Sequence, residues 1–193
     1  MSLAAAQLWN TRYSQEKQVW LARPPKQLLL DYEALLSASG RVLDAAAGVG
    51  ASGKYLAKKR LTVFSLDISI EGLKLAQRDY QNEDVEFIGA VMDLSIANLP
   101  QNYFDVILNF CFLERATFEI YRKSLKSDGL IFFETFVKDS SDIVYPDHYL
   151  EPGELLSKFS DFEIIHYDQV NRKTKNGVYD RKVVQLVARK RPK

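Results

Sequence analysis

The chain has 193 residues and a formal net charge of +1, and 47% of its residues are hydrophobic. This length fits a single domain with an ordinary core, and the near-neutral charge excludes a global basic field for nucleic acid. Its one cysteine, Cys111, excludes an intrachain disulfide and is typical of a reducing cytosol. We find no signal peptide and no apolar run of the ~18 residues that a membrane helix needs. We therefore expect one cytoplasmic domain over residues 1–193, a monomer or homodimer without nucleic-acid or membrane partners.

Polar residues and two tryptophans mix over residues 2–22, and part of this segment is compatible with a short amphipathic helix. A second helix is expected from Pro24, because proline suits the first helical turn and leucines then repeat at helical spacing as far as Gly40. We interpret this second helix as core packing.

A strand, a turn of small residues and a helix are predicted over residues 41–59. The apolar run of the strand ends at Asp44, small residues fill positions 45–50, and a helical pattern follows. Because Gly48 and Gly50 have no Cβ, a ligand can approach the backbone of this turn closely. The start of the following helix offers unpaired N–H groups to such a ligand.

A second apolar run ends in another carboxylate, Asp67, which lies 67 − 44 = 23 residues after Asp44. In a βαβ unit, an acid at the end of the second strand accepts both hydroxyls of a ribose bound over the first turn. Ser69 is expected to cap the next helix, which continues to about Gln81. The pattern predicts a nucleoside-binding half-fold with an acid at each of two strand ends.

These residues resemble the first motif of the class I S-adenosylmethionine-dependent methyltransferases, in which glycines follow an acid at alternate positions. Here Asp44 is the acid, Gly48 and Gly50 match, and Ala46 replaces the first glycine, a change that the turn tolerates where φ is negative. The resemblance implies S-adenosylmethionine as cofactor and a Rossmann-like α/β three-layer sandwich. Its sheet is expected to have seven strands, mostly parallel.

The resemblance also implies an adenosine site after the second and third strands. Asp67 would bind the ribose, Ile68 would pack on the adenine, and Asp93 would accept a hydrogen bond from the adenine amino group between Met92 and Leu94. Burial at a strand end for Ile68, and a solvated loop or helix cap for Asp93, are the alternatives.

Three further strands are predicted, within residues 85–88, 103–110 and 125–136. Ligands of parallel sheets lie beyond the carboxyl ends of the strands. We therefore expect Asn109 and Phe110 to border the transferred methyl group.

Several acidic and basic side chains lie on the expected acceptor side. Glu114 and Arg115 open a helix, and they either bind substrate or form a surface pair. Glu134 ends the fifth strand and is interpreted as a structural acid. The loop 137–152 is expected on the substrate side, and its His148 is a candidate for proton transfer because imidazole titrates near neutrality.

Residues 162–168 and 181–188 are expected to form two strands joined by a short turn, which allows only an antiparallel pair. Every earlier pair of strands is expected to be joined by a helix. In the resembling family, this closing hairpin distinguishes methyltransferases from dinucleotide dehydrogenases. His166 lies in the first of the two strands and is interpreted as structural.

Methyl transfer from a sulfonium is a direct displacement that needs alignment and exclusion of water but no metal. The sequence shows no obvious base, zinc-ligand cluster or Ser/His/Asp arrangement, so we predict no metal and favour a thiol-like nucleophile that needs little base help. Glu114 and His148 are the candidate catalytic residues.

The size and the segment from Trp9 to Tyr13 resemble small stand-alone methyltransferases of the tellurite-resistance and thiol types. The resemblance implies a small-molecule methyl acceptor and a lid, within residues 1–24, that closes Tyr13 over the methionine end of the cofactor. Packing of Trp9 and Trp20 on the domain, and a solvated Arg12 in place of one bound to the cofactor carboxylate, are the alternatives. A non-catalytic member that binds the cofactor or a partner, and a dinucleotide oxidoreductase, are the rival functions.

Overall fold

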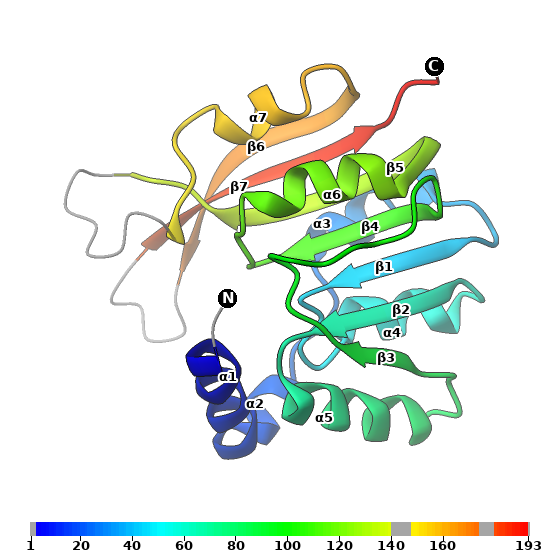
Figure 1. The fold of residues 1–193 in the computed structure, drawn as a ribbon, viewed down its shortest axis with the longest axis vertical. Helices are drawn as coiled ribbons and strands as arrows, with labels where there is room; N and C mark the ends of the chain where they lie inside the picture. The colour runs from blue at the N-terminus through cyan, green and yellow to red at the C-terminus, as the bar shows by residue number, and fades with distance from the viewer. Residues whose placement is uncertain (1–2, 140–147, 174–179, 193) are drawn as a thin grey trace.

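A computed structural model describes residues 3–139, 148–173 and 180–192, and its strands form one sheet in the order β3-β2-β1-β4-β5-β7-β6 (Figure 1). The strands are β1 Arg41–Ala45, β2 Thr62–Asp67, β3 Ile88–Val91, β4 Phe104–Phe110, β5 Leu125–Phe136, β6 Glu163–Lys173 and β7 Asp180–Arg189. Strands β1 to β5 pair in parallel, whereas β7 pairs antiparallel with both β5 and β6. The predicted Rossmann-like sheet and its antiparallel end are confirmed.

Helices cover both faces of the sheet, so the fold has three layers (Figure 1). They are α1 Leu3–Gln15, α2 Lys17–Leu21, α3 Gln27–Asp31, the 3-10 turn η1 Glu33–Leu35, α4 Ala51–Lys58, α5 Ile70–Gln81, α6 Ala116–Ser124 and α7 Glu154–Lys158. Helices α6 and α7 cover one face, α3 and α4 cover the other, and α5 runs along the β3 edge.

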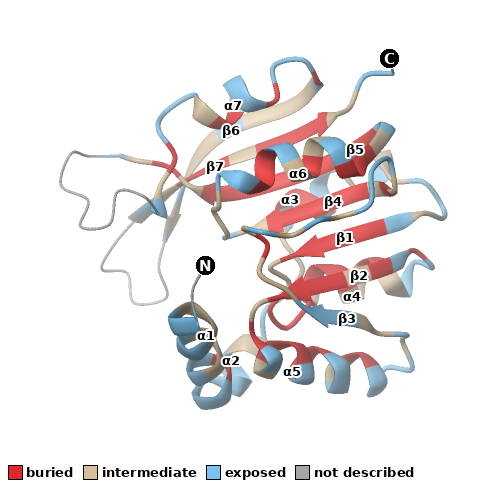
Figure 2. Cartoon of the chain, in the orientation of Figure 1, coloured by how far each residue is buried: buried red, intermediate tan, exposed pale blue. Residues whose placement is uncertain are grey.

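The central strands are largely buried (Figure 2), because helices cover both faces of the sheet. Alternate residues of β1 and β4 divide between two cores. Leu43 and Ile107 face α6 and α7 in one core, whereas Val42 and Leu108 face α3 and α4 in the other. The edge strand β3 is largely exposed. The carboxyl ends of the parallel strands are thereby held in fixed positions beside α1.

Three local predictions differ from the structure. Strand β3 begins at Ile88, because the chain after α5 first makes a turn in which the Val85 N–H donates to Tyr80 O at 3.0 Å. The helix expected from Pro24 begins only at Gln27 and gives way to η1 after one short run.

No helix joins β3 to β4 within the described chain, contrary to the expectation that a helix joins every early pair of strands. The side chain of Asp93 accepts hydrogen bonds from the N–H of Ser95 at 2.9 Å and from its hydroxyl at 2.6 Å. Such local bonds compete with helix formation. Among the described residues, no helix has the length and apolar character needed to cross a membrane.

Candidate active site

The carboxylates of Asp44 and Asp67 are brought together by the parallel pairing of β1 with β2, in which Asp44 pairs with Ser65 and Ala45 with Leu66. Asp67 Oδ2 accepts a 2.8 Å hydrogen bond from the Gly48 N–H, and its Oδ1 accepts a 2.7 Å bond from the Ser69 N–H. Both acids are buried. The end of β2 is therefore tied to the turn after β1, as a shared nucleoside site requires.

The turn after β1 places alternate residues in the left-handed region, with φ of 52° at Ala46, 58° at Gly48 and 68° at Gly50. Glycine adopts this conformation without steric cost. Ala46 does not meet the condition of a negative φ under which alanine suits its position, so its Cβ strains the turn. Gly50 also caps the start of α4.

Asp44 is the more strongly perturbed of the two acids. Burial raises the pKa of Asp44 to about 7, the Gly53 N–H opposes this rise, and the charge of Asp67 adds to it. Its Oδ2 is buried and has no hydrogen-bond partner among the described residues. Burial also raises the pKa of Asp67, against the N–H groups of Ser69, Gly48 and Ile68.

Two buried carboxylates, one with an unsatisfied oxygen, fit a ligand that carries hydroxyl donors and positive charge. S-adenosylmethionine has both, in its ribose diol and in its ammonium and sulfonium groups. The residues of the turn therefore suit the cofactor that the sequence motif implies.

Tyr13 of α1 covers this turn. Its ring lies across two glycines: a Cβ at Gly72 would be 2.9 Å from Tyr13 Cε2, and a Cβ at Gly48 would overlap the Tyr13 hydroxyl. The tyrosine is buried, and the burial, with the charge of Asp67, raises its pKa. Helix α1 is held in place by Asn10, whose Oδ1 accepts a 2.7 Å bond from the Ser69 hydroxyl.

The two tryptophans extend this cover rather than entering the two main cores. The Tyr13 and Trp20 rings are 4.9 Å apart and the Trp9 and Tyr13 rings 5.8 Å apart. Arg12 lies 5.1 Å from the Trp9 ring, and its side chain is on an exposed part of α1. A ligand that enters the turn has to share the space with Tyr13 or displace it.

The residues predicted for the adenine lie next to the Asp67 strand end. The Met92 N–H donates to Asp67 O at 2.9 Å, which fixes the chain after β3 beside β2. Ile68, Met92 and Asp93 are half-buried, and Leu94 is buried in the core. The structure thus brings this set together, while its contact with adenine stays a prediction.

The residues predicted for the methyl group differ in what they offer. The Asn109 side chain is buried, accepting a 3.0 Å bond from the Tyr121 hydroxyl and donating a 2.9 Å bond to Phe112 O. Phe110 is half-buried on the opposite face, among the residues that pack with α3 and α4. Because the Asn109 side chain is already hydrogen-bonded on both of its polar atoms, these two residues can offer a ligand only the Asn109 backbone and the Phe110 ring.

Arg115 does not pair with Glu114. Its guanidinium binds both oxygens of Glu154, at 2.7 and 2.9 Å, and Tyr149 O at 3.1 Å, so it joins α6 to α7. Glu114 Oε1 accepts a 3.4 Å bond from the Ala116 N–H at the start of α6. His148 is exposed, and residues 140–147 of the predicted loop 137–152 lie outside the described residues.

A cluster around Glu134 was not predicted. Glu134 is fully buried, and three side chains distant in the sequence converge on its carboxylate: Lys26, Arg172 and Gln185. Cys111 joins them through its sulfur, 3.0 Å from Lys26 Nζ, and through its backbone N–H, which donates to Glu134 O at 2.7 Å. The signal in the sequence was a lone acid within the apolar run Ile131–Phe136, but its partners carry no local motif.

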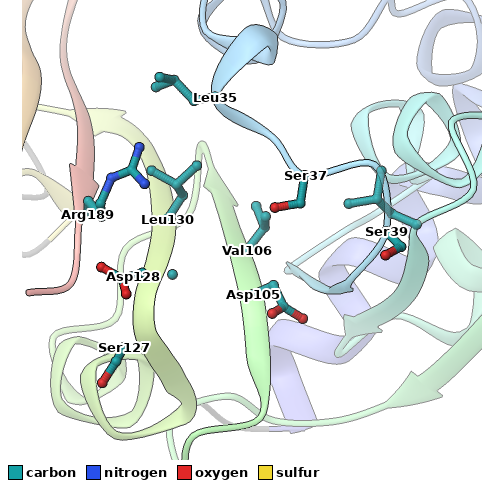
Figure 3. Close-up of a pocket in the computed structure, with 11 residues that line it drawn as sticks. Leu35, Ser37, Ser39, Asp105, Val106, Ser127, Asp128, Leu130 and Arg189 are labelled. Atoms are coloured by element: carbon teal, nitrogen blue, oxygen red, sulfur yellow. The ribbon is translucent and has the colours of Figure 1, made fainter. Parts of the chain in front are cut away.

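Two cavities described here lie away from the two acids. A cavity of about 150 Å³ lies at the amino end of β4, lined by Ser37, Ser39, Asp105 and others (Figure 3). Asp105 is tied there to the Arg41 N–H at 2.8 Å and to Lys126 at 2.7 Å. A second cavity, about 280 Å³, lies between α4 and the segment after α2. The described residues contain no group of acids, histidines or cysteines arranged to hold a metal.

Comparison with known proteins agrees with this geometry. Residues 42–129 match a family model described as a methyltransferase domain. TehB from Haemophilus influenzae is 19% identical with a TM-score of 0.80, over 95% of this chain and 67% of that one. A SAM-dependent methyltransferase from Methanosarcina mazei is 16% identical with a TM-score of 0.72, over 89% and 100%. An N-methyltransferase from Haemonchus contortus, solved with S-adenosylhomocysteine, is 16% identical with a TM-score of 0.67, over 86% and 52%.

A search of curated proteins finds no match. The solved structures share the fold, and the matched segment spans the turn and both acids. The chain therefore has the fold of S-adenosylmethionine-dependent methyltransferases, and the segment that carries the turn and both acids matches a methyltransferase domain.

Proposed function

We propose that the chain transfers a methyl group from S-adenosylmethionine to a small-molecule acceptor by direct displacement. The observation that carries the proposal is the Asp67–Gly48 hydrogen bond beside the unsatisfied oxygen of Asp44. The cofactor supplies an activated methyl group on a positively charged sulfur. The protein has to bind it, orient it and exclude water.

Each part of the proposed cofactor site has a proposed task. Asp67 accepts the ribose hydroxyls, and Asp44 faces the positive charge of the cofactor. Tyr13 closes over the methionine end once the cofactor has entered. The adenine lies between the ends of the second and third strands, against Ile68 and Met92 and with Asp93 at its edge, while Leu94 supports this wall from the core.

A small acceptor is supported by the architecture. The described residues form one sheet with its covering helices, and nothing in the formal charge of +1 favours a polyanion. We further propose one cytoplasmic domain, as a monomer or homodimer, with Glu114 and His148 as the first candidates for a base if the acceptor needs one.

Calorimetry with S-adenosylmethionine and its demethylated product tests cofactor binding. Transfer of radiolabelled methyl to a panel of thiols, selenite, tellurite, phenols and amines then tests catalysis. Binding without transfer to any of them would favour the non-catalytic alternative, to which the strained Ala46 and the Tyr13 ring in the proposed cofactor site lend support. Binding of a nicotinamide dinucleotide in place of S-adenosylmethionine would overturn the proposal.

A further inference from the structure

Glu134 lies on β5, where it pairs with Phe110 of β4 on one side and with Gln185 of β7 on the other. Its side chain is fully buried. A carboxylate is seldom buried in this way unless charged or hydrogen-bonded partners surround it.

The partners of Glu134 carry more positive charge than the carboxylate neutralises. Oε1 accepts a 3.2 Å bond from Lys26 Nζ, and Oε2 accepts bonds from Arg172 Nη2 and, at 2.7 Å, from Gln185 Nε2. Two cations therefore share one carboxylate. The Lys26 and Arg172 side chains are 25% and 38% exposed, so part of each cation faces outward.

The same lysine also reaches the end of β4. Lys26 Nζ lies 3.0 Å from the Cys111 sulfur and 6.0 Å from the centre of the Phe110 ring. Cys111 is exposed and has a positive φ of 59°. The excess cation is thus presented beside the aromatic ring that is expected to border the methyl group.

The cluster is also next to the cofactor turn. Across the sheet, Ala45 pairs with Asn109 and Phe110 pairs with Glu134, so only two strand spacings, roughly 10 Å, separate the end of β1 from Glu134. The Lys26 N–H donates to the Ser52 hydroxyl at 3.1 Å, in the first turn of α4.

We propose that the Glu134 cluster, formed by Lys26, Cys111, Glu134, Arg172 and Gln185, binds a carboxylate group of the methyl acceptor. The proposal rests on the proposed function and adds a substrate class to it. Arg172 donates to Glu134 through a single nitrogen in the described contacts, which leaves donors of its planar fork for a second carboxylate. Glu134 holds both cations in place before the ligand arrives, which lowers the cost of ordering them.

Cys111 provides a reporter within the cluster, because it is the only cysteine of the chain. Iodoacetate and iodoacetamide alkylate a thiolate in the same way: the sulfur forms a bond to carbon, iodide leaves, and the thiol proton goes to solvent. They differ in the charge of the group that the thiolate acquires. The ratio of their rates at Cys111, divided by the ratio for free cysteine, therefore measures attraction of a carboxylate independently of thiol reactivity.

We expect this normalised ratio to be about 10 in the wild-type protein, the factor that corresponds to one good charge-assisted contact. Arg172→Met and Lys26→Met should each lower it several-fold. Arg189→Met makes the same charge change at the opposite end of the sheet and should leave it unchanged. Glu134→Gln removes the competing carboxylate and should raise it. A wild-type ratio at or below that of free cysteine, or an equal response to Arg189→Met, overturns the proposal.

The acceptor role is tested with 3-mercaptopropionate and its amide, by binding to the protein loaded with demethylated cofactor and by kcat/KM. The acid should bind about tenfold more tightly, and Arg172→Met should remove that preference while affinity for the amide stays the same. Equal binding of acid and amide would overturn the acceptor role. Absence of S-adenosylmethionine binding to wild-type protein would instead sink the proposed function, and the alkylation ratio would still decide whether the cluster attracts carboxylates.

Discussion

Asp67 Oδ2 accepts a 2.8 Å hydrogen bond from the backbone N–H of Gly48, and this bond joins the two strand ends of the proposed cofactor site. The carboxylate is thus already oriented before a ribose arrives. A diol that binds to it gains charge-assisted hydrogen bonds with little further ordering.

Replacing Asp67 with Ala is expected to weaken S-adenosylmethionine binding by about 1–3 kcal/mol, the loss of charge-assisted bonds in a desolvated site. Calorimetric titration measures the affinity for S-adenosylmethionine. Asp67→Asn, which removes the charge but keeps the side-chain volume, is measured beside it. Asp105→Asn, at the far end of the sheet, is the control. Unchanged affinity in Asp67→Ala would remove this residue from the site.

The strain at Ala46 predicts a stabilising substitution. At a φ of 52°, an alanine is destabilised by roughly 1–2 kcal/mol relative to a glycine. Part of this gain is offset in the glycine variant, because glycine also gives the unfolded chain more conformational entropy. Ala46→Gly should therefore raise the free energy of unfolding by about 0.5–1 kcal/mol in urea titrations. Ala45→Gly, in the buried end of β1, should lower it. A loss of stability in Ala46→Gly would contradict the left-handed turn.

Tyr13 and Gly48 should be energetically coupled. Gly48→Ala adds a methyl group that overlaps the Tyr13 hydroxyl and also strains a left-handed backbone, so we expect a loss of about 2–4 kcal/mol. Tyr13→Phe removes the overlapping atom and should recover about 1 kcal/mol of that loss. The coupling is measured with a double-mutant cycle, from the free energies of unfolding in urea of wild type, both single variants and the double variant.

Gly153 is the matched control for this cycle. Its φ is 80°, but a Cβ there would meet nothing within 4 Å. Gly153→Ala should cost only the backbone strain, about 1 kcal/mol, and Tyr13→Phe should not change that cost. Equal coupling at both glycines would show that Tyr13 does not lie over the turn.

The raised pKa of Asp44 makes stability depend on pH. In the unfolded chain this carboxyl has its ordinary pKa near 3.8, whereas the folded protein holds the proton up to about pH 7. Between these two pKa values the folded state therefore binds more protons than the unfolded chain. The contribution of Asp44 protonation to the free energy of unfolding is complete below about pH 4 and is lost as the pH rises to 7. The slope is at most about 1.4 kcal/mol per pH unit.

Asp44→Asn has no such proton to lose. Relative to wild type, its stability should rise between pH 4.5 and pH 7, as urea unfolding at several pH values would show. Asp31→Asn, an exposed acid, should show no such trend. A constant difference between Asp44→Asn and wild type would mean that Asp44 is ionised throughout this range.

The sequence was sufficient to predict the sheet, its antiparallel end and the meeting of Asp44 with Asp67. These features follow from the length of apolar runs and from the short turn that only an antiparallel pair allows. Ser69 is confirmed as a helix cap, accepting a 3.1 Å bond from the Gly72 N–H.

Features that depend on tertiary contacts were not predicted. The sign of φ at Ala46 is imposed by the turn as a whole, and the start of β3 is delayed by the turn after α5. The partners of Glu134 come from positions 26, 111, 172 and 185, and the pairing of β5 with β7 and of β7 with β6 is needed to bring the last two near it. No local pattern reports such a convergence.

Lys26 contacts both the first turn of α4 and the Glu134 cluster, because its backbone N–H donates to Ser52 in α4 and its side chain donates to Glu134 in β5. A shift of α4 on loading of the methyl donor would reach the Lys26 backbone through this bond, and with it the position from which the ammonium group extends. The affinities for donor and acceptor are then thermodynamically linked, and by reciprocity each partner changes the other's affinity by the same factor. Replacing Ser52 with Ala would loosen that link while leaving both sets of ligand contacts in place.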